Sequence, residues 1–95
     1  MGHFNNVRYY AILDPNGGTV TKQTNYGTVT ISYVAIVVDA NSDADVIEYN
    51  LPIPKRDGYT FDGWYVDNIK VENSGTSWNY TENVKLVAHW TPTSQ

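Results

Sequence analysis

The chain has 95 residues, a formal charge of −4 and no cysteine, which fits one small domain without disulfides. Its six basic residues are scattered, which argues against nucleic acid or an anionic membrane as a partner, because both bind clustered Lys and Arg. The most apolar run, residues 31–38, is far shorter than the roughly 20 residues of a membrane-spanning helix.

Aromatic residues are what this chain offers for building a core. A domain of this size buries only about 60–65% of the surface of its unfolded chain. Three Trp, eight Tyr and two Phe compensate, since each buried ring hides about 150–250 Å². We expect residues 1–6 to be a vector-derived or disordered start, residues 7–91 to form one domain and residues 92–95 to be a polar tail or linker, with no signal peptide visible.

The first strand is predicted over residues 7–13, where β-branched and aromatic residues are dense. Residues 14–18 (DPNGG) then give a strong turn signal, because Asn16 and Gly17 tolerate the positive φ of a tight hairpin. Residues 19–24 should return as the second strand of that hairpin. Their polar composition predicts an edge strand with one face in water.

A break at residues 26–27 precedes residues 28–33, in which apolar and polar side chains alternate as in a half-buried strand. The alternation then fails, because residues 34–38 are all apolar. Either a bulge shifts the phase of the strand, or the strand becomes buried on both faces. We favour one long strand with a bulge near Tyr33 or Val34.

Residues 39–45 are small and acidic, and two interpretations stay open for them. The first is a solvated loop. The second is a short helix of about two turns, which would need tertiary contacts to be stable. In that helix Ser42 would be the N-cap, Asp45 would follow three residues later, and the packing side chains would be Val46, Ile47 and Tyr49.

Residues 51–65 (LPIPKRDGYTFDGWY) concentrate the apolar surface of the chain. Pro52 and Pro54 hold the backbone extended. Residues 55–58 then make a polar corner, at which Gly58 can take a positive φ. Four aromatic rings follow within seven residues: Tyr59, Phe61, Trp64 and Tyr65.

The last third of the chain predicts short strands and one clear amphipathic strand. Ile69 and Val71 interrupt the polar segment 66–77 and indicate a small strand, and Trp78 and Tyr80 lie on one side of an extended backbone before a turn at residues 81–83. In the last strand one face carries Val84, Leu86, Ala88 and Trp90, and the other carries Lys85 and His89. These patterns predict a mainly β protein of four to five strands, with α+β as the alternative if one short helix forms.

Four motifs in this order resemble the Listeria–Bacteroides repeat, the B-repeat module of internalin-type surface proteins. They are DPNGG at residues 14–18, PIPKRDGYTFDGWY at 52–65, WNY at 78–80 and VKLVAHW at 84–90. Residues 28–48 look longer than the usual connection of the family, and Val87 stands where the family usually has Tyr. The resemblance implies a small β-grasp-like module without catalysis or cofactor, often in tandem on secreted or wall-attached bacterial proteins.

Packing explains why the matched residues would be there. The rings should turn inward and close one core, and Gly63 should let another backbone or ring approach closely. The predicted core consists of Tyr59, Phe61, Gly63, Trp64, Trp78, Tyr80, Leu86 and Trp90.

Metal binding is not predicted. His89 should be an exposed strand residue, because no Cys and no second His beyond His3 is present to complete a zinc set. Three carboxylates could suggest calcium, but residues 39–50 lack the glycine and the final acidic residue of the helix–loop–helix calcium loop. Those carboxylates are Asp39, Asp43 and Asp45.

Catalysis is not predicted either. A glycosidase needs two carboxylates across a cleft, for which so small a domain has little room. The carboxylates that flank the aromatic segment are Asp57, Asp62 and Asp67, and turn chemistry explains the first and the last.

The function that we predict is that of a non-enzymatic extracellular module in a larger bacterial surface protein, as a spacer, an adhesion unit or a protein-interaction unit. Its partners would be neighbouring repeats and a host or cell-wall protein or glycan, and an open sheet edge could pair with a partner strand. The alternative is a carbohydrate-binding module, which would need coplanar rings exposed in a groove; a fragment of a hydrolase is a weaker third hypothesis. The candidate partner surface is Tyr9, Tyr10, Tyr26 and Tyr49.

Overall fold

The computed structural model describes residues 6–39, 45–78, 80 and 82–93, and these residues form strands and turns without a helix. The mainly β prediction is therefore confirmed. The strands are β1 (Asn6–Asp14), β2 (Thr21–Thr24), β3 (Gly27–Thr30), β4 (Tyr33–Asp39), β5 (Asp45–Asn50), β6 (Tyr59–Val66), β7 (Ile69–Val71), β8 (Ser74–Ser77) and β9 (Val84–Pro92).

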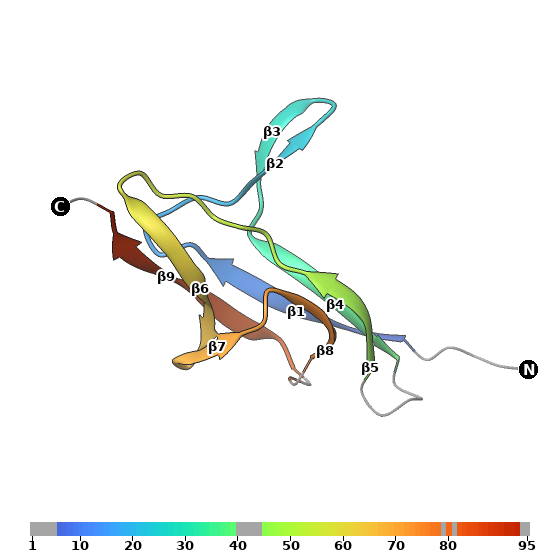
Figure 1. Cartoon of the computed structure of the whole chain (residues 1–95). Coiled ribbons are helices and arrows are strands. Elements are labelled where there is room, and N and C mark those ends of the chain that lie inside the picture. The colour runs from blue at the N-terminus through green and yellow to red at the C-terminus, as the bar shows by residue number, and fades with distance from the viewer. Residues whose placement is uncertain (1–5, 40–44, 79, 81, 94–95) are drawn as a thin grey trace, which may run out of the picture.

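The main sheet is built around a parallel pair of strands, β1 and β9. Seven strands are hydrogen-bonded in the order β7-β6-β9-β1-β4-β5-β8, and every pair other than β1 with β9 is antiparallel (Figure 1). The parallel pairing runs from Ala11 opposite Val84 to Asp14 opposite Val87. Because β1 extends before this ladder and β9 extends beyond it, the start of β1 and the end of β9 lie at opposite poles of the molecule (Figure 1).

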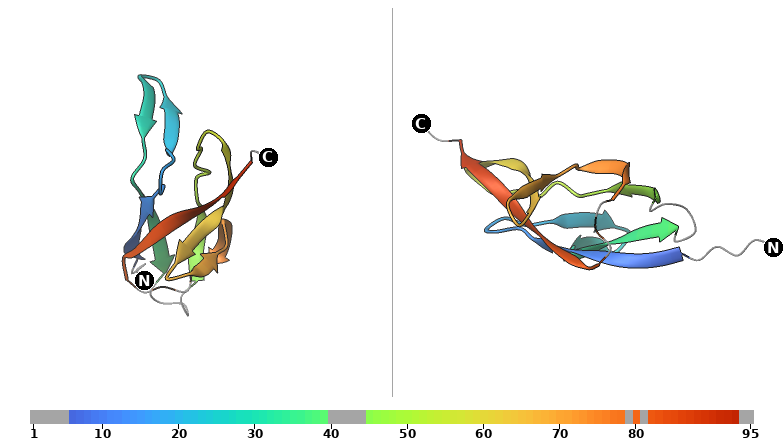
Figure 2. Two further views of the ribbon diagram at one scale, coloured as in Figure 1. Left: turned by 90° about the vertical axis from the view of Figure 1, so that its left-hand side faces the viewer. Right: turned by 90° about the horizontal axis from the view of Figure 1, so that it is seen from below.

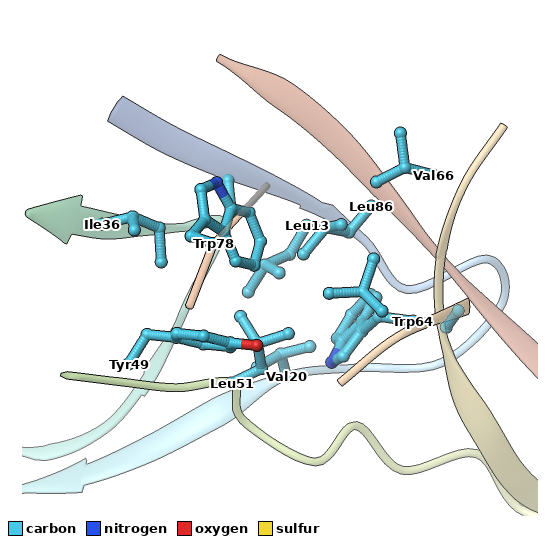
Figure 3. Packing of buried hydrophobic residues seen from close by; sticks show 12 residues of the cluster. Leu13, Val20, Ile36, Tyr49, Leu51, Trp64, Val66, Trp78 and Leu86 are labelled. Atoms are coloured by element: carbon cyan, nitrogen blue, oxygen red, sulfur yellow. The ribbon is translucent and has the colours of Figure 1, made fainter. Parts of the chain in front are cut away.

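The sheet folds over at the junction of β4 and β5, where only Val38 and Val46 pair. Beyond that point β5 and β8 lie apart from β1 and β4 as a second layer (Figure 2). Side chains from both layers meet in one cluster, with Tyr49 and Leu51 facing Trp78 and Leu13 (Figure 3). The core is thus enclosed by a single sheet that folds back on itself.

The turn predicted at residues 14–18 forms, but the hairpin predicted from it does not. Asn16 and Gly17 both have positive φ (49° and 97°), and Gly18 N–H donates to the Pro15 carbonyl at 3.0 Å. However, both edges of β1 are already paired, with β4 on one side and β9 on the other. The returning chain therefore cannot pair with β1, and Thr19 instead bridges to Lys55.

The long bulged strand predicted across residues 28–38 is also wrong, because the chain breaks at Ile31 and Ser32. Before the break, β3 pairs with β2 in a separate hairpin that projects from the rest of the molecule (Figure 1). All eight residues of β2 and β3 are exposed, so neither strand is half-buried as predicted. After the break, β4 enters the main sheet and buries Ile36 completely.

The residues that were to pack in the short helix considered after Ser42 do not form a helix, because Asp45–Asn50 is strand β5. Residues 40–44 lie outside the described residues. The small strand predicted around Ile69 and Val71 is confirmed as β7.

The extended segment 51–54 covers the core as a strap. Leu51 is buried, its N–H donates to Asn73 O at 2.7 Å, and Asn73 Nδ2 donates back to Leu51 O at 3.1 Å. The indole of Trp64 donates to Pro52 O at 2.9 Å. These hydrogen bonds fix the position of a segment that has no regular secondary structure. Each of them pairs a backbone polar group that lies against the core.

Gly63 lies at a bulge of β6 and has a φ of 138°, which favours glycine. The group that approaches it is different from the backbone or ring that we predicted. A Cβ atom at Gly63 would lie 2.7 Å from Cε of Lys70, so the aliphatic stem of a lysine crosses this position.

Gly18→Ala is expected to destabilise the fold by about 1–3 kcal/mol, because no space exists for a methyl group. A Cβ atom there would lie 2.5 Å from Cζ2 of Trp90 and 2.6 Å from the carbonyl oxygen of Lys55. Urea unfolding of the variant measures the loss. The matched control is Gly75→Ala, whose new atom would meet Tyr49 at an ordinary 3.6 Å and should change the free energy of unfolding by less than about 0.5 kcal/mol. Equal losses for both variants would contradict the packing described here.

Candidate functional site

The aromatic residues predicted as core mostly lie inside the molecule. Trp64 has 0% of its surface exposed and Trp78 has 4%, and Leu86 is also fully buried. Phe61, Tyr80 and Trp90 are partly buried and pack against this cluster. The rings meet at angles typical of aromatic pairs, with Phe61 and Trp64 5.5 Å apart and Trp78 and Tyr80 5.5 Å apart between centroids.

Tyr59 is the exception, because it does not belong to the core cluster. It is 36% exposed and pairs with Pro92 at the far end of β9. The guanidinium of Arg56 lies over its ring, with Cζ 3.7 Å from the centroid. Tyr59 is two residues before Phe61 and so lies on the same face of β6, but it lies beyond the end of the core.

The four tyrosines proposed as a partner surface do not form one patch. Tyr49 is only 5% exposed and packs edge-on against Trp78 at 4.9 Å. Tyr9 packs against the core cluster, and Tyr26 stands at the tip of the β2–β3 hairpin with 98% of its surface exposed. Only Tyr10 lies on the outer face of the main sheet, so the predicted surface is wrong as a single site.

Burial raises the pKa of Tyr49 above its ordinary value of 10.0, and the negative charge of Glu72 adds to this effect. The Tyr49 hydroxyl also donates to the Glu72 carbonyl at 3.2 Å. Because the folded state holds the proton of Tyr49 more tightly than the unfolded state does, protonated Tyr49 stabilises the fold below about pH 10. This stabilisation is lost as the pH rises through the folded pKa.

Tyr49→Phe should therefore flatten the alkaline fall in the free energy of unfolding, measured by urea titration between about pH 9 and about pH 11. An unchanged slope would show that Tyr49 does not ionise differently in the two states.

An outer aromatic patch does exist, on strands β1 and β4, and we define it by Tyr10, Ile12 and Tyr33. Ile12 and Tyr33 are register partners across the two strands and are 42% and 55% exposed. The rings of Tyr10 and Tyr33 meet edge to face at 5.5 Å. Together with Asn83 these side chains line a hollow of about 260 Å³.

This patch is held by the backbone as well as by the rings. Tyr10 N–H donates to Oδ1 of Asn83 at 2.8 Å, which ties the loop before β9 to β1. The sequence contained one signal for it: Tyr10 and Ile12 lie two apart and therefore share a face of their strand. Tyr33 was missed because its pairing with Ile12 depends on the break before β4, which the sequence pattern did not reveal.

The candidate catalytic and metal-binding residues do not converge. Asp57 precedes β6 and Asp67 follows it, so the two stand at opposite ends of an eight-residue strand. Asp62 accepts a hydrogen bond from the Thr91 hydroxyl at 2.6 Å. His89 is half-buried and stacks on Tyr65, with ring centroids 3.7 Å apart, rather than standing free as predicted.

No three His, Asp or Glu residues within the described ranges are grouped so that they could hold a metal ion. Of the carboxylates considered for calcium, Asp43 lies outside those ranges. Within the described part of the chain, there is also no helix that could cross a membrane.

The model of the family described as Listeria-Bacteroides repeat domain matches residues 9–89, which is most of the chain. No curated protein and no solved structure matches. The matched residues include the 14–18 turn, the aromatic strand β6 and residues 84–89 of β9.

Proposed function

This chain belongs to the Listeria–Bacteroides repeat domain family, and we propose that it is a repeat module that binds a protein partner through its outer aromatic patch. The family suggests a non-catalytic repeat module of a bacterial surface protein, with neighbouring repeats in a larger chain. An extracellular or wall-attached location is part of this proposal. The five-strand order β7-β6-β9-β1-β4, with its parallel pair at the centre, supports the β-grasp-like architecture that the resemblance implies.

The exposure of Ile12 and Tyr33 is the observation that carries the proposal of a protein partner. These side chains would be buried if the outer face of the sheet were covered by another element of the domain, and instead they lie open beside Tyr10. Exposed Tyr rings with an aliphatic neighbour are typical of the centre of a protein interface. A contiguous group of exposed apolar side chains is typical of an interaction site, whereas apolar residues that are exposed singly are ordinary on a protein surface.

The carbohydrate alternative has less support from the arrangement of the rings. A sugar-stacking site needs exposed coplanar rings, whereas Tyr10 and Tyr33 meet at 80°. Tyr65 and His89 are nearly coplanar at 8°, but they stack on each other and both are half-buried. Trp64 and Trp78 are buried in the core.

The test is a binding panel of purified extracellular host proteins and cell-wall glycans, probed with the 95-residue chain and two variants. Tyr33→Lys should weaken binding to a protein partner at least about tenfold, because it places a charge at the centre of the patch. Tyr26→Lys, which makes the same change at a more exposed tyrosine at the hairpin tip, should leave that binding unchanged. Binding that resists Tyr33→Lys, or binding to glycans alone, would contradict the proposed surface.

A further inference from the structure

A second surface feature lies at the pole where β9 ends, and it is charged rather than apolar. It is a hollow of about 640 Å³ between the 14–18 turn and the corner before β6. Thr19 and Lys55 hold its two walls together through a pair of backbone hydrogen bonds, each 2.8 Å long. Its lining residues are Gly17, Gly18, Thr19, Lys55, Arg56, Asp57 and Tyr59, and we call it the polar hollow.

The polar hollow contains the only adjacent pair of basic residues in an acidic chain, Lys55 and Arg56. Arg56 is held in place, since its guanidinium lies over the Tyr59 ring at 3.7 Å and its Nη1 lies 3.5 Å from the carbonyl oxygen of Asn16. The one ion pair within the described residues joins Lys85 to Asp14, so neither cation of the hollow has a carboxylate partner there. Asp57 lines the same hollow without approaching either cation to ion-pair distance.

Such an arrangement is suited to binding carboxylates. A guanidinium has five N–H donors in a planar fork, and stacking on an aromatic ring fixes the direction of that fork before a ligand arrives. Carboxylates accept two parallel hydrogen bonds from such a fork. The ammonium of Lys55 adds a second positive charge on the same wall, so an acidic segment with several carboxylates fits better than a single ion.

The geometry of the two poles points to the source of that segment. Thr93 N–H donates to Gly58 O at 2.9 Å, which places the polar hollow beside the end of β9. At the opposite pole β1 begins at Asn6, which pairs with Asp39 at the end of β4. In the sequence, Asp39 opens the segment 39–45, which has three Asp in seven residues and no basic residue. β1 begins and β9 ends at opposite poles of the molecule (Figure 1), so a row of repeats joined end to end would bring the end of β9 in one copy toward the start of β1 in the next.

We therefore propose that the polar hollow binds the acidic segment 39–45 of a second copy of this module, so that consecutive repeats dock pole to pole. This inference rests on the proposed function, because it requires neighbouring repeats. The contact joins two different surfaces and so extends along a row instead of closing a dimer. Its strength should be modest and should fall as salt is added, since exposed charge pairs are individually weak and are screened.

The test uses a synthetic peptide with the sequence of residues 38–47 (VDANSDADVI), titrated at low salt into the ¹⁵N-labelled 95-residue chain. The peptide should shift the amide signals of Gly17, Gly18 and Thr19, and added salt should reverse the shifts. Arg56→Gln should weaken peptide binding by about three- to fivefold, because it removes the charged fork. The matched control is Arg8→Gln, which removes an exposed cation from the other pole and should change the affinity less than about twofold.

Reversing the charge at position 56 tests the same proposal through a gain of binding. Arg56→Glu should lose the acidic peptide and bind a peptide in which lysine replaces the three aspartates. An acidic peptide that leaves the hollow signals unmoved, or that binds equally well to the Arg56→Gln chain, would overturn the inference. Tyr33→Lys should leave peptide binding intact, so failure of the outer patch and failure of the polar hollow are separate results.

Discussion

Trp64→Ala is expected to lower the free energy of unfolding by about 3–5 kcal/mol. Trp64 is fully buried, packs on Phe61 and donates its indole N–H to Pro52 O. Its removal would leave a large cavity and take away the hydrogen-bond partner of that carbonyl. A domain of this length has a total stability of only about 5–14 kcal/mol, so the variant should be partly unfolded well below the melting temperature of the native chain.

Thermal unfolding is the measurement for Trp64→Ala. A loss of this size corresponds to a fall in Tm of at least about 12 °C in a domain of fewer than 100 residues. Tyr26→Ala is the control, because it also removes an aromatic ring but from a side chain that is 98% exposed. That variant should stay within about 0.5 kcal/mol of the native chain. A Trp64→Ala chain that melted as the control does would contradict the description of one aromatic core.

Trp90→Ala is expected to cost about 3 kcal/mol, at the lower end of the range for tryptophan because the side chain is only partly buried. Trp90 joins the last strand to the first turn: its indole N–H donates to Pro15 O at 2.9 Å, and its ring covers Gly18. The ring also packs on Phe61 at 5.6 Å. Loss of the side chain would therefore loosen the 14–18 turn as well as the core.

A comparison of two variants separates the contributions of the Trp90 side chain. Trp90→Phe keeps a smaller aromatic ring and removes the hydrogen bond to Pro15 together with the indole atoms over Gly18, so it should cost at least about 1 kcal/mol in urea unfolding. The remaining loss in Trp90→Ala would then come from packing. If both variants lost the same free energy, the ring would contribute nothing to the core, and its described role would be wrong.

Local features of the fold could be predicted from the sequence because each depends on residues close together in the chain. The turn at Asn16 and Gly17 follows from their tolerance of positive φ, and the inward face of β9 follows from the alternation around Leu86 and Ala88. The family resemblance could also be recognised from the sequence, because its motifs are short and occur in a fixed order. What these features do not specify is which strand lies beside which.

The main errors concern pairing between distant segments. The hairpin predicted after residues 14–18 fails because β9, more than 60 residues later, takes the edge of β1. Tyr49 was proposed as part of the partner surface, but its pairing with Gly75 turns the ring toward Trp78. Tyr59 was placed in the core with the other rings of the matched motifs, and those motifs carry no information on where the core ends.

The candidate site was predictable only in part for the same reason. Tyr10 was identified from composition, whereas its neighbour Tyr33 depends on the register between β1 and β4. The polar hollow combines the turn near Gly17 with Arg56, which the fold brings together from 39 positions apart. No pattern within either segment shows that they meet.

Intrinsic tryptophan fluorescence of the whole chain tests most directly whether the indoles hold this small sheet together from within. The folded chain should emit at a clearly shorter wavelength than the chain in urea, and iodide should quench it far less, because two of the three tryptophans are almost fully buried and the third is partly covered. Emission and iodide quenching that matched those of the unfolded chain would place the indoles in water and contradict the account.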